Sequence, residues 1–109
     1  MANAYKILGQ LADASSNDVT LYTVPSSTET IVSSIIICNR ENAANTFRLA
    51  IKANGGSVST EDYIAFDSSI QANDTITLVL GITLDATDII SAGASDANVT
   101  FSCYGTEIS

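Results

Sequence analysis

Residues 75–84, TITLVLGITL, constrain the fold more than any other segment of the sequence. Every even position holds isoleucine or leucine, whereas Thr75, Thr77 and Thr83 stand at odd positions. A period of two puts every second side chain on one face, as in a strand with one buried side. A helix would instead need apolar residues three and four apart. The segment therefore predicts a β-strand with its even positions inside.

The rest of the chain repeats this strand pattern. Residues 46–52 place Phe47, Leu49 and Ile51 on one face, and the segment after residue 98 places Val99, Phe101 and Cys103 on one face. Residues 30–39, TIVSSIIICN, are more continuously apolar, which predicts a central strand covered on both faces, where a neighbouring subunit is one possible cover. Shorter strands are expected at residues 5–8, 20–24, 63–66 and 89–92.

Turn residues separate these segments. Asn54-Gly55-Gly56 favours positive φ angles, and Val24-Pro25-Ser26-Ser27 and Gln71-Ala72-Asn73-Asp74 bound strands. A chain of 109 residues is the size of one domain. We therefore expect an all-β fold: a single antiparallel, jelly-roll-like β-sandwich of about eight short strands. Residues 1–18 are expected to form an N-terminal strand or arm with its connection, and residues 19–109 the sandwich.

The charge balance excludes several kinds of partner. The chain has 4 Lys and Arg against 12 Asp and Glu, for a net charge of -8. This charge repels phosphate backbones and anionic membranes, so neither nucleic acid nor membrane is an expected partner. There is also no apolar run near the length of a membrane span. We expect a protein made in the cytosol without a secretory signal.

Catalytic residues are hard to find in the sequence. With no histidine, Ser-His-Asp and Cys-His arrangements and histidine-ligated zinc sites are excluded. Glu61-Asp62 and Asp85 with Asp88 are candidate carboxylate pairs for glycosidic chemistry, and Asp85–Asp88 is a candidate calcium turn. Ordinary solvated loops account for both, so we expect no enzyme, no cofactor and no metal.

Two cysteines and four tyrosines complete the candidate residues. Cys38 and Cys103 lie in apolar strand segments, and in a reducing cytosol we expect both to be buried, reduced thiols. The tyrosines are candidates for a platform that stacks on sugars, although packing at strand ends explains them equally well; they are Tyr5, Tyr22, Tyr63 and Tyr104.

Several segments in the same order resemble a group of short bacteriophage virion proteins, notably of marine and cyanobacterial phages. The resemblance covers nearly the whole chain and rests on AYKILGQ (4–10), LYTVP (21–25), VSSIIICNR (32–40), TFRLAIK (46–52), YIAFD (63–67), QANDTITLVLGITL (71–84) and VTFSCYGTEI (99–108). It implies a small β-sandwich that is built in many copies into the particle, commonly as a symmetric oligomer. It carries over no binding residue position by position.

The function that we expect is that of a non-enzymatic virion structural protein, a multi-copy capsid decoration or cement protein that stabilises the particle. Its partners would be itself, as a homotrimer, and other virion proteins such as the major capsid protein. Contacts are expected at strand edges and at the apolar residues of the N-terminal segment, Tyr5, Ile7, Leu8 and Leu11. The alternative is a tail, baseplate or fibre-attachment component that binds a receptor or carbohydrate. A glycan-cleaving enzyme that uses the acidic pairs is the third hypothesis.

Overall fold

The computed structural model describes residues 3–109 and is built almost entirely of β-strands. The elements are β1 (Asn3–Leu11), β2 (Val19–Thr23), β3 (Glu29–Asn39), β4 (Asn45–Lys52), the 3-10 helix η1 (Thr60–Asp62), β5 (Tyr63–Ile70), β6 (Thr75–Leu84), β7 (Ile89–Ala94) and β8 (Val99–Ile108). Each strand contains or overlaps one of the predicted segments, so the all-β class is confirmed. Within residues 3–109, no helix has the length and apolar character needed to cross a membrane.

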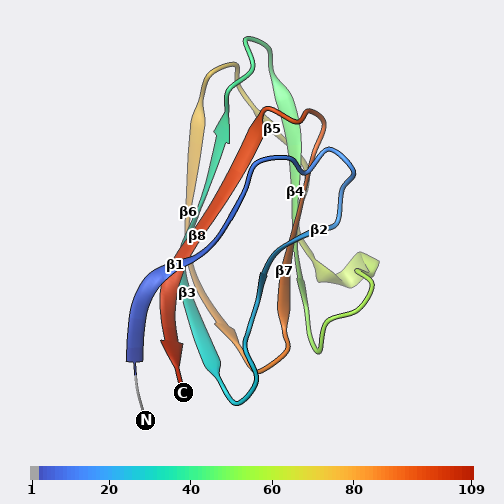
Figure 1. Cartoon of the computed structure of the whole chain (residues 1–109). Coiled ribbons are helices and arrows are strands. Elements are labelled where there is room, and N and C mark those ends of the chain that lie inside the picture. Colours follow the sequence, from blue (N-terminus) through green and yellow to red (C-terminus); the bar gives the residue numbers. More distant parts are fainter. Residues whose placement is uncertain (1–2) are drawn as a thin grey trace.

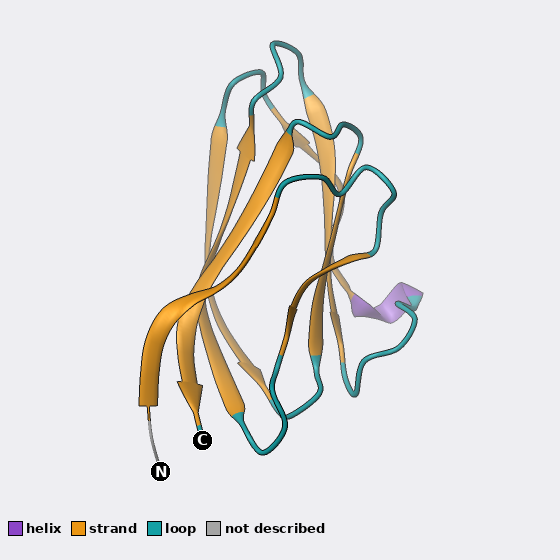
Figure 2. Cartoon of the chain, in the orientation of Figure 1, coloured by secondary structure: helices purple, strands orange, loops and turns teal. Residues whose placement is uncertain are grey.

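The strands form two antiparallel sheets of four, which face each other as two layers (Figures 1 and 2). The first sheet has the order β1-β8-β3-β6 and the second the order β2-β7-β4-β5. Strand one thus pairs with eight, two with seven, three with six and four with five, as if one long hairpin had been rolled up. This is the strand order of a jelly roll, so the predicted β-sandwich is confirmed.

Aliphatic side chains from both sheets fill the space between the layers. Ile35, Ile37 and Leu49 are fully buried there, and Phe101 and Cys103 on β8 point inward as the alternation predicted. Asn54, Gly55 and Gly56 have the predicted positive φ angles, of 63°, 71° and 87°. The apolar residues of both sheets thus form one core between the layers.

A line of β-bulges crosses the first sheet. The pairing register shifts at Leu8 on β1, at Ser33 on β3 and at Leu80-Gly81 on β6. Two glycines lie close to this line because strands approach closely there: a Cβ on Gly9 would collide with the carbonyl of Leu21, and one on Gly105 with the carbonyl of Ile31. The bulges bend the sheet and change which side chains of β3 face outward.

The structure bears on two predictions for β3, and the bulge corrects one of them. Residues 30–39 are central, between β6 and β8, but only one of their faces is covered by this chain: Ile31 is 43% exposed, and Ile36 and Cys38 are partly exposed. Ser33 and Ser34 both lie on the outer side, so the alternation skips one residue there. The prediction that Cys38 is buried is therefore wrong, because this shift places it on the outer face. Both cysteines are free thiols, and Cys103 is buried as predicted.

The predicted N-terminal arm is strand β1, which pairs with β8 of the same chain. Met1 and Ala2, the first residues of that segment, lie outside the described residues. After β1, Ala14 is fully buried, and its carbonyl accepts 3.0 Å hydrogen bonds from the N–H groups of Asn17 and Ala94. The connection from β1 to β2 is thus held against β7.

Candidate interaction surface

The outer side of the first sheet carries no charged side chain over most of its area. Directly paired residues of neighbouring strands share a side of a sheet, so the register defines the rows of this surface. We call it the uncharged face. Its rows run from β1 through β8 and β3 to β6. The first row is Tyr5, Thr106, Ile31 and Thr83, and the second is Ile7, Tyr104, Ser34 and Val79. The third is Gln10, Ser102, Ile36 and Thr77, and the fourth, which begins at β8, is Thr100, Cys38 and Thr75.

Large apolar side chains stand out from this surface. Tyr5 is 82% exposed, Ile7 53%, Ile31 43% and Val79 83%. Leu8 and Leu11 of the same N-terminal segment instead pack partly against the sandwich core. Of the four predicted contact residues, two therefore lie on the uncharged face and two belong to the edge of the core.

The charged side chains gather elsewhere. Only Glu29, Asp67 and Glu107 of the acidic residues lie in strands; the others lie in loops, turns or η1, at positions 13, 18, 41, 61, 62, 74, 85, 88 and 96. Glu29 is at the end of β3, beyond the rows of the uncharged face, and Glu107 pairs with Thr30, whose side chain is buried. In a chain of net charge -8, this surface is therefore the region where like charges repel a neighbour least.

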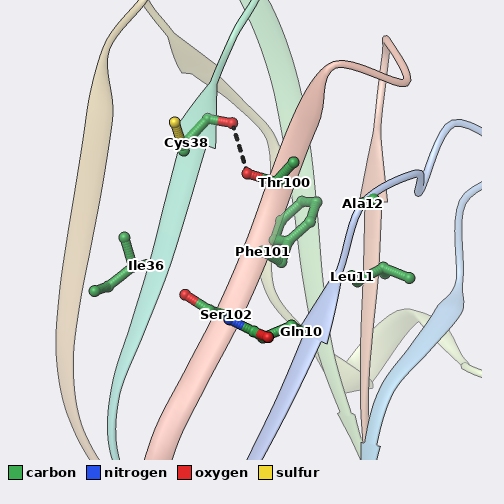
Figure 3. A pocket seen from close by; sticks show the side chains of 8 residues that line it. All are labelled: Gln10, Leu11, Ala12, Ile36, Cys38, Thr100, Phe101 and Ser102. Carbon is green, nitrogen blue, oxygen red and sulfur yellow. Dashed lines mark hydrogen bonds between the residues drawn. The ribbon is translucent and has the colours of Figure 1, made fainter. Parts of the chain in front are cut away.

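A shallow depression of about 340 Å³ marks one end of the uncharged face, where Gln10, Ile36, Cys38, Thr100 and Ser102 surround it. Figure 3 shows Ile36 and Cys38 on one side of the sheet and Leu11 and Phe101 on the other. Thr100 donates a weak 3.5 Å hydrogen bond from its hydroxyl to the carbonyl of Cys38. The depression holds no carboxylate or cation, so it fits packing against a partner better than chemistry on a substrate.

The acidic pairs singled out in the sequence stabilise loops. The Asp88 carboxylate accepts hydrogen bonds from the N–H groups of Asp85 at 2.8 Å and Asn54 at 2.9 Å. The Asp62 carboxylate accepts the N–H of Ser59 at 2.7 Å and lies 3.6 Å from the ammonium of Lys52. Among residues 3–109, no three acidic or cysteine side chains converge in a way that would hold a metal ion. Asp85 and Asp88 do line a hollow of about 390 Å³ at the end of β3 and β6, together with Glu29, but the Asp88 carboxylate is engaged by the two backbone N–H groups.

The four tyrosines do not form one platform. Tyr5 and Tyr104 lie on the uncharged face, whereas Tyr22 is 7% exposed between the sheets. Burial and the neighbouring Glu107 carboxylate raise the pKa of Tyr22 far above its ordinary range. Tyr63 lies on β5 in the other sheet and donates a 2.9 Å hydrogen bond to Asp18.

The second sheet carries a small aromatic cluster, of which the sequence analysis identified Tyr63 but not Phe66. Phe66, 56% exposed, contacts the edge of Tyr63 at 4.9 Å between ring centroids, and the guanidinium of Arg48 lies 4.1 Å from its centroid. Arg48 also makes two hydrogen bonds, of 2.7 and 3.2 Å, to Asp67 and holds the pKa of that carboxyl below its ordinary value. A hollow of about 300 Å³ is lined by Thr60, Tyr63 and Phe66. An exposed ring and a half-buried ring beside a charged pair are groups that can contact a sugar or a peptide.

Comparison with known proteins gives a likeness of fold without a family. No protein-family model matches the sequence, and no curated protein matches it. In three dimensions, 97% of the chain is similar to part of a chain in the structure of infectious bursal disease virus, Gx strain, with a TM-score of 0.49 and 12% sequence identity. The protein covers 32% of the length of that chain, or about a third.

Proposed function

We propose that this protein is a non-enzymatic structural component of a bacteriophage particle, a capsid decoration protein present in many copies. The single observation that carries the proposal is the uncharged face: a four-stranded surface with exposed Tyr5, Ile7, Ile31 and Val79 and no charge between them. Large apolar side chains that stand out together on one face without charges are typical of surfaces that a partner covers.

The size of the face suits such a contact. Four strands about 4.8 Å apart, each with about nine residues at about 3.3 Å, cover roughly 570 Å². A standard interface buries about 800 Å² on each partner, with a spread of about 200 Å², so the face is close to the lower end of that range. The resemblance to phage virion proteins supports another virion protein as that partner, and we propose the major capsid protein.

Association of copies is the second part of the proposal. We propose a homo-oligomer, with the trimer expected from the sequence as its stoichiometry. The acidic loops keep free copies apart in solution, whereas strand edges without charge allow copies to pair at defined places. The product of the interaction is a stiffer particle, made in the host cytoplasm and carried in the virion.

Binding to particles tests this role directly. Phage particles that lack the protein are mixed with the purified chain, and the bound copies are counted by quantitative mass spectrometry. Ile7→Glu and Val79→Glu each place a charge on the uncharged face and are expected to lower binding at least about tenfold. Ile64→Glu is the matched control, because Ile64 is an exposed aliphatic residue, 48% exposed, on β5 of the other sheet. Equal binding by all three variants, or absence of the chain from native particles, contradicts the proposal.

A tail or baseplate component that binds a receptor or carbohydrate is the alternative, and the Tyr63–Phe66 cluster favours it. A glycan array with the wild-type chain and with Phe66→Ala separates the two. Binding of a glycan that Phe66→Ala abolishes supports the alternative. An empty array together with loss of particle binding in the face variants supports the decoration role.

A further inference from the structure

Strand β6 is an outermost strand of the first sheet, with no neighbour on its far side among residues 3–109. The other three edge strands carry features that hinder pairing. Lys6 places a charge in β1, β2 has only five residues and an irregular register, and β5 holds Asp67 at a φ of 50° beside register shifts. In β6, Thr75–Val79 pairs regularly with β3 and contains no charge, proline or bulge. An edge of this kind is a template for another strand.

The backbone groups on this open edge can be assigned. The N–H of Asn39 donates a 2.9 Å hydrogen bond to the carbonyl of Asp74, so residue 74 directs its backbone toward β3. Successive residues of a strand direct these groups to opposite sides. The N–H and C=O groups of Thr77 and Val79 and the C=O of Thr75 therefore point to the open edge, whereas the N–H of Thr75 donates a 2.8 Å hydrogen bond to the Asp74 carboxylate.

The inner side of β6 is also incompletely covered. Ile76, Leu78, Leu80 and Ile82 point toward the core but stay partly exposed, whereas Val32, Ile35 and Ile37 on the adjacent β3 are fully buried. A further strand beside β6 that presented aliphatic residues on the same side would complete their burial. Such burial stabilises the contact, because it removes apolar surface from water.

We propose that β6 pairs antiparallel with β6 of a second copy, across a two-fold axis at Thr77. Thr77 then lies opposite Thr77, Thr75 opposite Val79, and Ile76 opposite Leu78 of the other copy. Thr77 exchanges two backbone hydrogen bonds with Thr77 of the other copy, the N–H of Val79 donates to the carbonyl of Thr75, and the aliphatic row meets an aliphatic row. The first sheets of two copies join into one continuous sheet.

The sequence of β6 explains why the occupant is a second copy. An antiparallel pair keeps side chains on their own face only when the sum of the paired residue numbers is even, and the register centred on Thr77 meets this condition. It places Asp74 opposite Leu80, so that the acidic residues of the two chains do not face each other. The strand is thus complementary to itself in shape, polarity and charge. The inference rests on the proposed function only in requiring many copies, and a trimeric assembly would use the same contact to link trimers in pairs.

Two aspartate variants in one cross-strand row test the contact. Thr77 and Ser102 belong to the same row of the uncharged face, but Ser102 lies on the central strand β8. Thr77→Asp sets two carboxylates opposite each other at the two-fold axis and is expected to raise the dissociation constant at least about tenfold in light scattering or sedimentation. Ser102→Asp charges the face without touching the edge and is expected to associate like wild type. Circular dichroism checks that both variants are folded.

A cysteine cross-link tests the register. In a Cys38→Ser background, Thr77→Cys places two thiols across the axis at a Cα separation of about 5.5 Å, which suits a disulfide. Mild oxidation is expected to link Thr77→Cys into covalent dimers, while Ser102→Cys stays unlinked. A wild-type chain that is monomeric at every concentration, equal weakening by both aspartate variants, or equal cross-linking of both cysteine variants overturns the inference. Because these measurements use the isolated protein, they are independent of whether it is found in phage particles, which tests the function itself.

Discussion

The phenol of Tyr22 on β2 donates a 2.6 Å hydrogen bond to the carboxylate of Glu107 on β8, and the bond joins the two sheets of the sandwich. The Thr30 hydroxyl lies 2.8 Å from the same phenol oxygen, and the ammonium of Lys6 lies 2.7 Å from the other oxygen of Glu107. This small polar network connects four strands, β1, β2, β3 and β8, through side chains at the border of an otherwise apolar core.

Tyr22→Phe is expected to lower the free energy of unfolding by about 1–2 kcal/mol. The change keeps the ring in place but leaves Glu107 with one donor fewer in a setting where its side chain is 12% exposed. Urea unfolding followed by circular dichroism measures the effect. Tyr5→Phe is the matched control, since the Tyr5 ring is 82% exposed, and it is expected to leave the unfolding midpoint unchanged. Equal midpoints for the two variants would show that the network adds no stability.

The same network makes the free energy of unfolding depend on pH. Lys6 first, and Tyr22 next, hold the pKa of Glu107 below its ordinary value. A carboxyl whose pKa is lower in the folded state stabilises the fold above its unfolded pKa, and this contribution disappears as the pH falls through the folded pKa. Glu107→Gln is therefore expected to be less stable than wild type at neutral pH and to approach it in acid. Unfolding midpoints measured across this range that keep a constant difference contradict the assignment.

Leu80→Asp is expected to destabilise the isolated domain by about 2–3 kcal/mol, whereas Thr77→Asp changes it by less than about 0.5 kcal/mol. Leu80 packs partly against the core, and Thr77 is exposed on the outer side of the same strand. The cost stays below that of a fully buried charge because β6 is an edge strand that water can reach. Thermal melts at a dilution where both variants are monomeric provide the measurement, and equal melting temperatures would contradict the register.

The two thiols are expected to react at very different rates. Cys38 is partly exposed on the uncharged face, whereas Cys103 is fully buried, and burial raises the pKa of its thiol to about 11. A polar thiol reagent at mildly alkaline pH should label Cys38 in the native protein and Cys103 only after unfolding. Mass spectrometry of labelled peptides, with Cys38→Ser as the control, distinguishes the sites. Rapid native labelling of Cys103 would mean that the core opens easily.

The strands could be predicted from the sequence because alternation with a period of two is a local property. For Thr75–Leu84, the pattern also gave the correct inner and outer faces. Residues 30–39 show where this reasoning ends. A bulge lies at Ser33-Ser34, and it depends on how β3 pairs with β6 and β8. Alternation in the sequence alone therefore could not predict that Cys38 faces outward.

The candidate surface was only partly predictable for a related reason. Tyr5 and Ile7 were identified as contact residues, but Val79 was not. In the sequence, Val79 is an apolar residue among threonines on the side of the strand that is predicted to be polar. The uncharged face becomes visible only when the register places residues of four distant segments in common rows. Buried Asn39 is similar: its amide donates to the carbonyls of Ala43 at 2.9 Å and Gln71 at 3.0 Å, and this role needs the fold to be recognised.

Gly105 and Gly81 allow the line of bulges to be tested with one kind of substitution. A Cβ on Gly105 would collide with the carbonyl of Ile31 on the neighbouring strand, whereas one on Gly81 meets no atom within 4 Å, and neither glycine has a positive φ. Gly105→Ala is therefore expected to lower the free energy of unfolding by about 1–3 kcal/mol, since backbone must move to admit the methyl group. Gly81→Ala is expected to be neutral or slightly stabilising, because alanine restricts the unfolded chain more than glycine does. Chemical unfolding of the two variants beside wild type gives the comparison. Two equally stable variants would mean that β8 and β3 do not approach as closely at the bulge as the structure has them.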